Sequence, residues 1–241
     1  MKVSIVIPAY NEEKLLGATL SKIHLADKAI TALDAHYEII VCDNNSTDKT
    51  GEIARTAGAR VVFEPVNQIG RARNPGVEAA NRNSLLFIDA DSFPAPQLLA
   101  DVIQAMRTER YLAGGSTVKL VDGGALAGVV ASCWNCTSRL TRLLAGSFIF
   151  VETQVFRDLG GFNLELYVSE ELELSKRLQR AARLAGKKLV ILHRHPLQTS
   201  ARKVKLYSSY EHLRFLLRAV AGPGRTLRNA RACHIWYDGR R

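Results

Sequence analysis

The sequence predicts an α/β fold, a mostly parallel twisted sheet flanked by helices, followed by a basic helical extension at the C-terminus. Over the first 95 residues, short apolar runs alternate with segments of helical periodicity. This alternation is typical of a parallel sheet with right-handed crossovers. The chain has 241 residues and is 47% hydrophobic with a mean hydropathy of −0.04, enough for one sizeable core.

Four strands and three helices are expected in the first 95 residues. The strands are predicted at Val3–Pro8, Glu38–Asp43, Ala59–Glu64 and Leu85–Ile88, and the helices at Lys14–Ile23, Lys49–Thr56 and Arg71–Ala80. Ser46 and Asp48 are candidate N-caps of the second helix. Pro75 predicts a boundary or kink in the third helix, because proline lacks the backbone N–H that a helix interior needs.

The second part of the chain changes its pattern but keeps both kinds of element. Helices are predicted at Pro96–Arg107, Leu126–Leu144, Glu170–Ala185 and Tyr207–Val220, and extended segments at Leu112–Val121, Phe148–Val151 and Leu189–Leu192. Gly160 and Gly161 predict a turn before Phe162, and Ser169 is a candidate N-cap of the following helix. No internal repeat and no low-complexity linker interrupts these elements, so one domain with an extension is expected.

Charge is distributed unevenly along the chain. Residues 1–175 carry 16 Lys and Arg against 21 Asp and Glu, a net of −5, whereas residues 176–241 carry 17 against 2, a net of +15. A basic C-terminal segment indicates an anionic partner, such as membrane lipid or a phosphorylated acceptor. The alternative is a solvated basic face without a partner.

Asp89 and Asp91 directly follow the apolar run Leu85–Ile88. In an open α/β sheet, ligands bind beyond the carboxyl ends of the strands. Two neighbouring carboxylates are costly unless a cation lies between them, and oxygen ligands suit Mg²⁺ or Mn²⁺. The pair therefore predicts a divalent metal that holds the phosphates of a substrate. The alternative for such residues is turn formation or helix capping.

Three further polar segments stand at equivalent places in the chain. They are Pro8–Glu13 after the first strand, Asp43–Asp48 after the second, and Gly70–Gly76 at the start of a helix. With Asp89-Ala90-Asp91, and with Gly160-Gly161-Phe162 followed by Ser169–Leu174, they make the chain resemble the family 2 glycosyltransferases of the GT-A fold. The resemblance runs from Val3 to about Gln179 and implies sugar transfer from a nucleotide-sugar donor with Mg²⁺ or Mn²⁺.

The resemblance also implies roles for individual residues on the donor side. Six of them are expected to contact the nucleotide-sugar and one to bind the metal. Pro8, Tyr10 and Glu12 would shape the nucleotide pocket, Asp43 would contact the base, Arg73 the nucleotide and Asp89 the ribose, while Asp91 would bind the metal. It further implies a domain over residues 1–205, with a nucleotide-binding half at 1–95, an acceptor half at 96–205 and a basic extension at 206–241.

The catalytic base is expected in the acidic pair Glu170-Glu171, where the family more often has Glu-Asp. Glu171 takes the base position, one methylene longer than the usual aspartate. It would remove the proton from an acceptor hydroxyl that attacks the anomeric carbon from the opposite face, which gives inversion. The alternative is an acidic first helical turn that complements the helix dipole.

Weaker candidates complete the site. His195 could join the metal shell, Arg202 lies in a basic loop that could close over phosphate, and Trp134 could stack on an acceptor. Gly146 and Ser147 fall where the family has an acceptor-side strand. Cys133 and Cys136 form a Cys-x-x-Cys spacing without a second pair of zinc ligands, so ordinary reduced thiols are expected.

Other function classes fit the same residues less well. A haloacid dehalogenase-type phosphatase also uses Asp-x-Asp, but on its first strand, and a dehydrogenase would carry Gly-x-Gly-x-x-Gly after the first strand. A non-catalytic sugar- or lipid-binding relative stays open.

The acceptor is expected to be a sugar, a lipid-linked molecule or another small molecule, and no nucleic acid is expected. With no apolar run of about 20 residues, a cytoplasmic protein is predicted, with a possible peripheral position on the inner membrane face.

Overall fold

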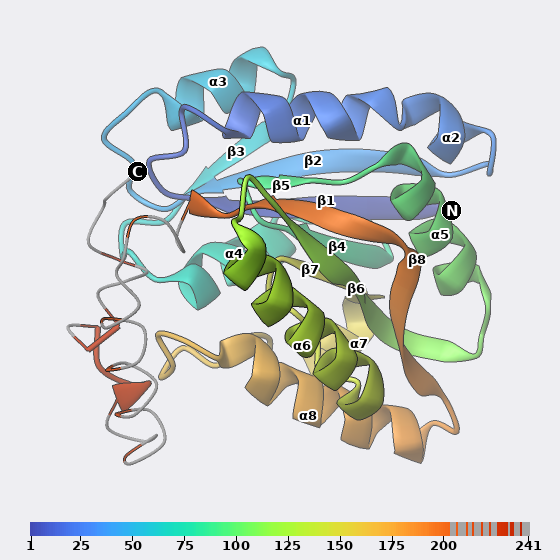
Figure 1. Cartoon of the computed structure of the whole chain (residues 1–241). Coiled ribbons are helices and arrows are strands. Elements are labelled where there is room, and N and C mark those ends of the chain that lie inside the picture. The colour runs from blue at the N-terminus through green and yellow to red at the C-terminus, as the bar shows by residue number, and fades with distance from the viewer. Residues whose placement is uncertain are drawn as a thin grey trace.

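The computed structural model describes residues 1–202 and, beyond them, residues 206, 211, 214, 218, 222, 226–230, 232–233 and 237. An eight-stranded sheet runs through this part of the chain in the order β3-β2-β1-β4-β7-β6-β8-β5, with helices on both faces (Figure 1). The predicted fold class, a mostly parallel α/β sheet flanked by helices, is confirmed.

The sheet has eight strands, and the described part of the chain has eight helices between them. The strands are β1 (Lys2–Ala9), β2 (His36–Asp43), β3 (Arg60–Phe63), β4 (Ser84–Ile88), β5 (Ser92–Phe93), β6 (Tyr111–Val121), β7 (Phe148–Glu152) and β8 (Lys188–Ser200). The helices are α1 (Leu16–Leu25), α2 (Asp27–Thr31), α3 (Thr50–Thr56), α4 (Ile69–Glu78), α5 (Pro96–Arg107), α6 (Ala125–Thr141), α7 (Thr153–Asp158) and α8 (Glu170–Leu184).

The strands β1 to β4 form a parallel part of the sheet. β1 pairs in parallel with β2 and with β4, and β2 pairs in parallel with β3. All five residues of β4 are buried, as expected of a central strand that is covered on both faces. Because the chain leaves each of these strands at the same edge of the sheet, the loops after β1, β2 and β4 meet there.

The rest of the sheet is mixed. β7 lies antiparallel between β4 and β6, and β8 runs parallel to β6 and antiparallel to the short β5. The expectation of a strand ending at Leu192 is wrong, because β8 continues to Ser200 alongside β6 and carries His193 and His195 within it. The short helices α2 and α7 were not expected, since each spans less than two turns and has little periodicity to detect.

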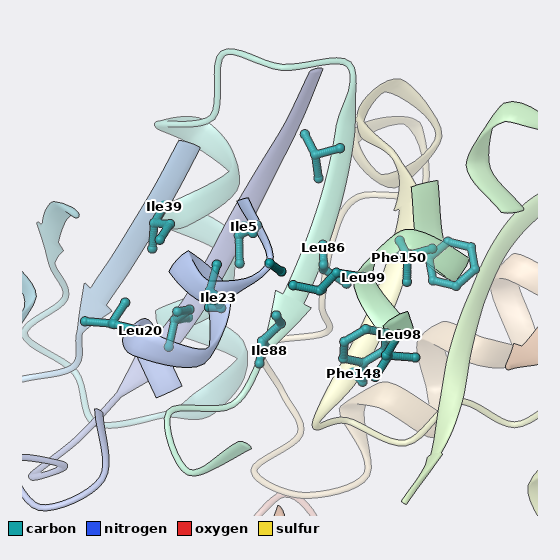
Figure 2. Packing of buried hydrophobic residues seen from close by; sticks show 14 of the residues in the cluster. Ile5, Leu20, Ile23, Ile39, Leu86, Ile88, Leu98, Leu99, Phe148 and Phe150 are labelled. Atoms are coloured by element: carbon teal, nitrogen blue, oxygen red, sulfur yellow. The ribbon is translucent and has the colours of Figure 1, made fainter. Parts of the chain in front are cut away.

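Two apolar layers cover the sheet. One contains Ile5, Ile39, Leu86 and Phe148 with the inner faces of α1 and α5 (Figure 2). The other contains the alternate strand residues with α4, α7 and α8. Gly76 of α4 sits directly on the sheet, because a Cβ there would lie 2.5 Å from Cys42 Sγ and from Val6 Cγ1. This close contact brings α4 against β1 and β2, beside the loops that meet at the sheet edge.

Two local predictions need correction. The helix α4 continues through Pro75 to Glu78, so no boundary lies at the proline. Ser169 does occupy the N-cap position of α8, but it has a left-handed backbone, with φ of 69°, and its side chain makes no capping hydrogen bond. The acidic first turn of α8, not Ser169, therefore complements the helix N-terminus.

The helix predicted at Tyr207–Val220 lies almost entirely outside the described residues. Within the described part of the chain, no helix has the length and the apolar character that crossing a membrane requires. The division of the chain at residues 95 and 205 stays a prediction, and residues on both sides of position 95 contribute to the same sheet.

Candidate functional site

The loops that follow β1 and β2 are joined by hydrogen bonds. The backbone N–H of Asn11 donates to Ser46 Oγ at 3.0 Å, and that of Thr47 donates to Asn11 Oδ1 at 2.8 Å. The backbone N–H of Glu12 donates to Thr50 Oγ1 at 2.8 Å in a buried position. Each loop therefore supplies acceptors for backbone N–H groups of the other loop, which holds both loops in place.

A pocket at the sheet edge lies between the ends of β1 and β4, and we call it the β1–β4 pocket. Five of the predicted residues line it, namely Pro8, Tyr10, Glu12, Asp89 and Asp91. Glu12 and Asp91 are each only 6% exposed. The structure thus brings most of the predicted donor-side residues together around one concave surface.

Asp43 and Asn44 occupy different places although they are neighbours in sequence. Asp43 Oδ1 accepts a hydrogen bond from the backbone N–H of Ser46 at 3.0 Å, and Asp43 does not line the β1–β4 pocket. Asn44 does line it and is 2% exposed. Its Nδ2 donates to the carbonyl of Val66 at 2.6 Å, and its Oδ1 accepts from the N–H of Gln68 at 2.8 Å. Sequence reasoning missed Asn44, whose signal is its place beside Asp43 after β2.

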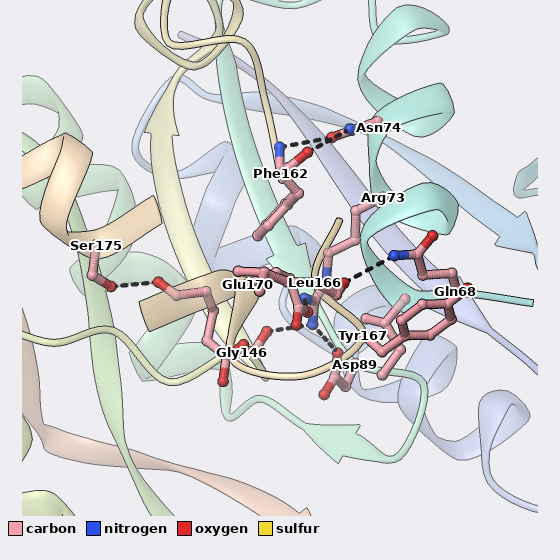
Figure 3. A network of polar contacts seen from close by, with 12 residues as sticks. Gln68, Arg73, Asn74, Asp89, Gly146, Phe162, Leu166, Tyr167, Glu170 and Ser175 are labelled. Atoms are coloured by element: carbon pink, nitrogen blue, oxygen red, sulfur yellow. Dashed lines mark hydrogen bonds and ion pairs between the residues drawn. The ribbon is translucent and has the colours of Figure 1, made fainter. Parts of the chain in front are cut away.

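Arg73 is the centre of the polar network in Figure 3. It is 2% exposed, its Nη1 donates to Glu170 Oε1 at 2.7 Å, and its Nη2 donates to Asp89 Oδ1 at 2.9 Å and to the carbonyl of Gly146 at 2.8 Å. The guanidinium also lies 5.0 Å from the ring centre of Phe162. Arg73 was predicted to contact the nucleotide, but here protein groups from three segments engage its guanidinium.

A second pocket lies on the other side of Arg73, and we call it the α8 pocket. Glu170 and Glu171 line it together with Gly146, Ser147 and Asp89. A Cβ on Gly146 would stand 3.3 Å from the Glu171 side chain and 3.4 Å from Arg73, so the absence of a side chain at this position leaves room for both. The predicted acceptor-side residues Gly146 and Ser147 are thus brought beside the predicted base.

The Gly-Gly-Phe turn is fastened to α4 by Asn74. Its Oδ1 accepts from the N–H of Phe162 at 3.0 Å, and its Nδ2 donates to the carbonyl of Phe162 at 3.1 Å (Figure 3). Gly161 has a φ of 71°, and a Cβ there would lie 2.8 Å from Asn74 Oδ1. Only glycine fits this approach without strain. Two neighbouring residues of α4 therefore make these contacts: Asn74 binds the turn, and Arg73 binds Glu170 of α8.

The electrostatics of this network follow from burial. Burial acts to lower the pKa of Arg73, but the charges of Asp89, Glu170 and Glu171 more than offset it, so the pKa is raised and the guanidinium stays charged. Burial and then the negative charge of Glu171 raise the pKa of Glu170 to about 8, against the opposing effect of Arg73. Three carboxyl groups face one guanidinium, so the charge of Arg73 does not fully offset the effects of burial and of Glu171 on the pKa of Glu170.

Asp91 and Glu12 face a second cation, Arg202. Its Nη2 lies 2.7 Å from Glu12 Oε1 and 3.6 Å from Asp91 Oδ2. Burial acts to lower the pKa of Arg202, but the hydrogen bond and charge of Glu12 and the charge of Asp91 raise it overall. Among the described residues, no three His, Cys, Asp or Glu side chains gather closely enough to enclose a metal ion by themselves.

The donor set nevertheless fits a hard divalent ion. Asp89 and Asp91 present carboxylate oxygens to the β1–β4 pocket, and Mg²⁺ typically binds through one or two carboxylates together with substrate phosphates. The positive charge of Arg202 already lies against one of them, so a cation is accommodated electrostatically at this edge.

Two weaker candidates lie elsewhere. His195 Nδ1 is 2.9 Å from Asp101 Oδ2 of α5. The backbone of Ser200 is hydrogen-bonded to Asp91. His195 lies five positions before Ser200 on β8, which corresponds to roughly 16 Å along the strand. Trp134 is half-buried on α6 and lines neither the β1–β4 pocket nor the α8 pocket. The structure does not bring either residue to the other site residues.

The described residues near the C-terminus contact the wall of the α8 pocket. The backbone N–H of Tyr167 donates to the carbonyl of Leu227 at 2.8 Å, and the hydroxyl of Tyr237 donates to the carbonyl of Tyr167. The same hydroxyl accepts from the N–H of Ile69 at 3.3 Å. Tyr167 and Ile69 both line the pocket, so the C-terminal segment supports it. Sequence reasoning missed this contact, because no local pattern links positions so far apart.

Comparison with known proteins is consistent with this geometry. The model of the family described as "Glycosyl transferase family 2" matches residues 4–131. An uncharacterized glycosyltransferase of Mycobacterium tuberculosis is 40% identical over 104 residues, which cover 42% of this chain and 43% of that protein. A dolichol-phosphate mannosyltransferase of Pyrococcus furiosus is 33% identical over 132 residues, covering 52% and 35%. The matched part thus spans less than half the length of these relatives.

Solved structures share the fold. The mannosyltransferase PcManGT from Pyrobaculum calidifontis, in complex with GDP-Man and Mn²⁺, superposes with a TM-score of 0.69 and 18% identity, covering 96% of this chain and 64% of that one. S. aureus TarS residues 1–349, in complex with UDP-GlcNAc, has a TM-score of 0.67 and 20% identity, covering 99% and 71%. At these identities the likeness shows the fold.

Proposed function

The chain belongs to glycosyl transferase family 2, and on that premise we propose that it transfers a sugar from a nucleotide-sugar donor to an acceptor hydroxyl. The donor would bind in the β1–β4 pocket, with Pro8 and Tyr10 beside the nucleotide and Asp89 near the ribose. Asp43 remains the proposed contact to the base. Asn44, through its bond to Gln68, would fix the loop between β3 and α4 beside the bound base.

Asp91 is the proposed metal ligand, and the metal would be Mg²⁺ or Mn²⁺. When bound, such an ion offsets negative charge on the departing nucleoside diphosphate. Arg202 Nη2 lies 3.6 Å from Asp91 Oδ2, and we assign Arg202 a contact with the diphosphate. The oxygen donors at this edge support the assignment of a hard divalent ion.

Glu171 is the proposed general base. Its side chain lines the α8 pocket beside Ser147 and Asp89, where an acceptor hydroxyl has access to it. It would take the hydroxyl proton as that oxygen attacks the anomeric carbon opposite the leaving group, which inverts the configuration. Glu170 is 3% exposed and accepts a hydrogen bond from Arg73, so it is assigned a positioning role.

One observation carries the proposal: Asp89 lines both pockets and is bonded to Arg73 between them. A donor in the first pocket and an acceptor in the second would therefore meet at Asp89. Such a meeting point is what a group-transfer enzyme needs and what a simple binding protein does not. The geometry leaves the chemical class of acceptor open among sugars, lipid-linked molecules and small molecules.

The proposal is tested by a thermal-shift panel on the full chain. UDP, GDP and dTDP sugars are added with Mn²⁺, with Mg²⁺ or with EDTA, and the melting temperature is recorded. At least one nucleotide sugar should raise it through binding linkage, and only with metal. Release of the corresponding nucleoside diphosphate in the presence of acceptors then reports transfer.

Two outcomes would count against the proposal. If no nucleotide sugar stabilised the protein with either metal, the transferase proposal would be wrong. If one bound but was never turned over with any acceptor, the non-catalytic alternative would be preferred.

A further inference from the structure

Arg202 is fixed at the edge of the β1–β4 pocket by the backbone around it. The N–H of Ser200 donates to the carbonyl of Asp91 at 3.0 Å, and the N–H of Ala201 donates to that of Val121 at 3.2 Å. The N–H of Arg202 itself donates to Ser200 Oγ at 3.1 Å. The end of β8 is thus tied to the segment that carries Asp91, and Arg202 enters from that end.

The guanidinium of Arg202 lies against two buried carboxylates, those of Glu12 and Asp91. The distances from its Nη2 are 2.7 Å and 3.6 Å, and the three side chains are between 7% and 14% exposed. Two carboxylates buried this deeply require a compensating positive charge. A divalent cation bound to Asp91 would supply the same compensation, so the two cations have overlapping electrostatic roles.

The hydrogen bonding of Arg202 is incomplete. A stable arginine–carboxylate pair commonly uses two parallel N–H groups of the guanidinium fork. Here a single nitrogen, Nη2, makes the contact to Glu12. The Nε and Nη1 atoms are buried and have no hydrogen-bond partner within the described part of the chain. Buried donors without acceptors are unfavourable, so this position of Arg202 leaves hydrogen bonds that another partner could satisfy.

Arg73 provides the contrast within the same molecule. Both of its terminal nitrogens have partners, in Asp89, Glu170 and Gly146, and only its Nε lacks one among the described residues; its side chain is 2% exposed. Arg202 makes one hydrogen bond through a terminal nitrogen and its side chain is 14% exposed. Arg73 therefore has the contacts of a permanent structural cation, whereas Arg202 has those of an exchangeable one.

Resting on the proposed function, we infer that Arg202 is an internal cation that competes with the divalent metal for Glu12 and Asp91. Metal binding and the present position of Arg202 would then exclude each other. A nucleoside diphosphate offers oxygen acceptors to the displaced guanidinium, so it lowers the cost of moving Arg202. Metal and nucleoside diphosphate would consequently bind cooperatively, and each would increase the affinity for the other by the same factor.

The test is a titration of the full chain with Mn²⁺, in which free Mn²⁺ is read by electron paramagnetic resonance. Wild type and Arg202→Met are titrated with Mn²⁺ alone and with Mn²⁺ in the presence of UDP or GDP. Arg194→Met, an exposed arginine on the same strand β8, controls for the loss of one positive charge. Arg202→Gln is a second substitution in case the methionine variant folds poorly.

Removal of Arg202 is expected to increase the affinity for Mn²⁺ alone by about 5- to 50-fold, a typical range for coupled sites. The Arg194→Met control should change it by less than about twofold. The increase in Mn²⁺ affinity caused by UDP or GDP should shrink in both Arg202 variants. Equal Mn²⁺ affinity in wild type and Arg202 variants, with Mn²⁺-dependent nucleotide binding intact, would overturn the competition and leave the proposed function standing. Absence of Mn²⁺ binding in every variant, with and without nucleotide, would overturn both.

Discussion

The two pockets on either side of Arg73 are built in different ways. The β1–β4 pocket is held by short hydrogen bonds between loops that leave parallel strands, such as those of Asn11 with Ser46 and Thr47. The α8 pocket depends on one buried arginine that α4 contributes from the first part of the chain. The comparison teaches that the proposed donor site is organised by contacts between loops that leave neighbouring strands, whereas the proposed catalytic acid–base site is organised around a single buried cation.

Removal of Arg73 should produce the largest effect. In Arg73→Met, Asp89 and Glu170 lose their buried partner, and the free energy of unfolding should fall by about 3 to 5 kcal/mol. Chemical denaturation measures this loss. Arg71→Met on the same helix, where Nε bonds only to Gln68, is the matched control and should cost less than about 1 kcal/mol. Equal small losses in both variants would show that the α8 pocket does not depend on Arg73.

Replacement of the proposed base should separate catalysis from binding. Glu171→Gln should slow transfer by roughly 10²- to 10⁴-fold, because the carboxylate that accepts the proton is gone. Steady-state release of nucleoside diphosphate measures this rate. Glu173→Gln, in the same first turn but paired with Arg177 at 2.6 Å, should change it only by about threefold or less. Near-normal transfer in Glu171→Gln would remove Glu171 from the role of base.

The raised pKa of Glu170 predicts a pH dependence of stability. Between its ordinary value of 4.5 and about 8, the folded protein holds a proton that the unfolded chain releases. The associated stabilisation is therefore full below pH 4.5 and is lost as the pH rises through 8. Glu170→Gln cannot ionise, so its stability relative to wild type should rise between pH 5 and pH 9, by roughly 4 kcal/mol. Urea denaturation at several pH values measures it, and parallel pH profiles would contradict the raised pKa.

The support of the α8 pocket by the C-terminal segment should have the smallest effect. Tyr237→Phe removes the hydroxyl that bonds to Tyr167 and Ile69, and should cost about 1 kcal/mol of unfolding free energy. Tyr111→Phe at the start of β6 should cost less than about 0.5 kcal/mol. Chemical denaturation of both variants in parallel measures the two losses of unfolding free energy. If the two cost the same, the hydroxyl of Tyr237 does not support the pocket.

The sequence predicts the β1–β4 pocket better than the α8 pocket for a physical reason. Asp89 and Asp91 follow an apolar strand directly, and parallel strands must deliver their following loops to one edge. The partners of Arg73 come from three segments that are 16 to 97 positions away along the chain. Such contacts arise from tertiary packing, and no local spacing encodes them.

Two departures from expectation have the same origin. His195 was a weak candidate for the metal shell, and the strand before it was expected to end at Leu192; pairing with β6 instead extends β8 to Ser200, and His195 contacts Asp101. Pro75 was expected to mark a boundary or a kink, but helix α4 continues through it to Glu78 and packs closely on β1 and β2. In both cases neighbouring elements of the fold override a local signal.

The difference between the two pockets is tested most directly by Mn²⁺-dependent nucleotide binding in two variants. Asp91→Asn and Glu171→Gln are each titrated with UDP and with GDP by calorimetry, in the presence and absence of Mn²⁺. We expect Asp91→Asn to lose the Mn²⁺-dependent part of nucleotide binding, while Glu171→Gln keeps the wild-type affinity within about threefold. If both variants lost it, or if Asp91→Asn kept it, the assignment of donor and base to separate pockets would be contradicted.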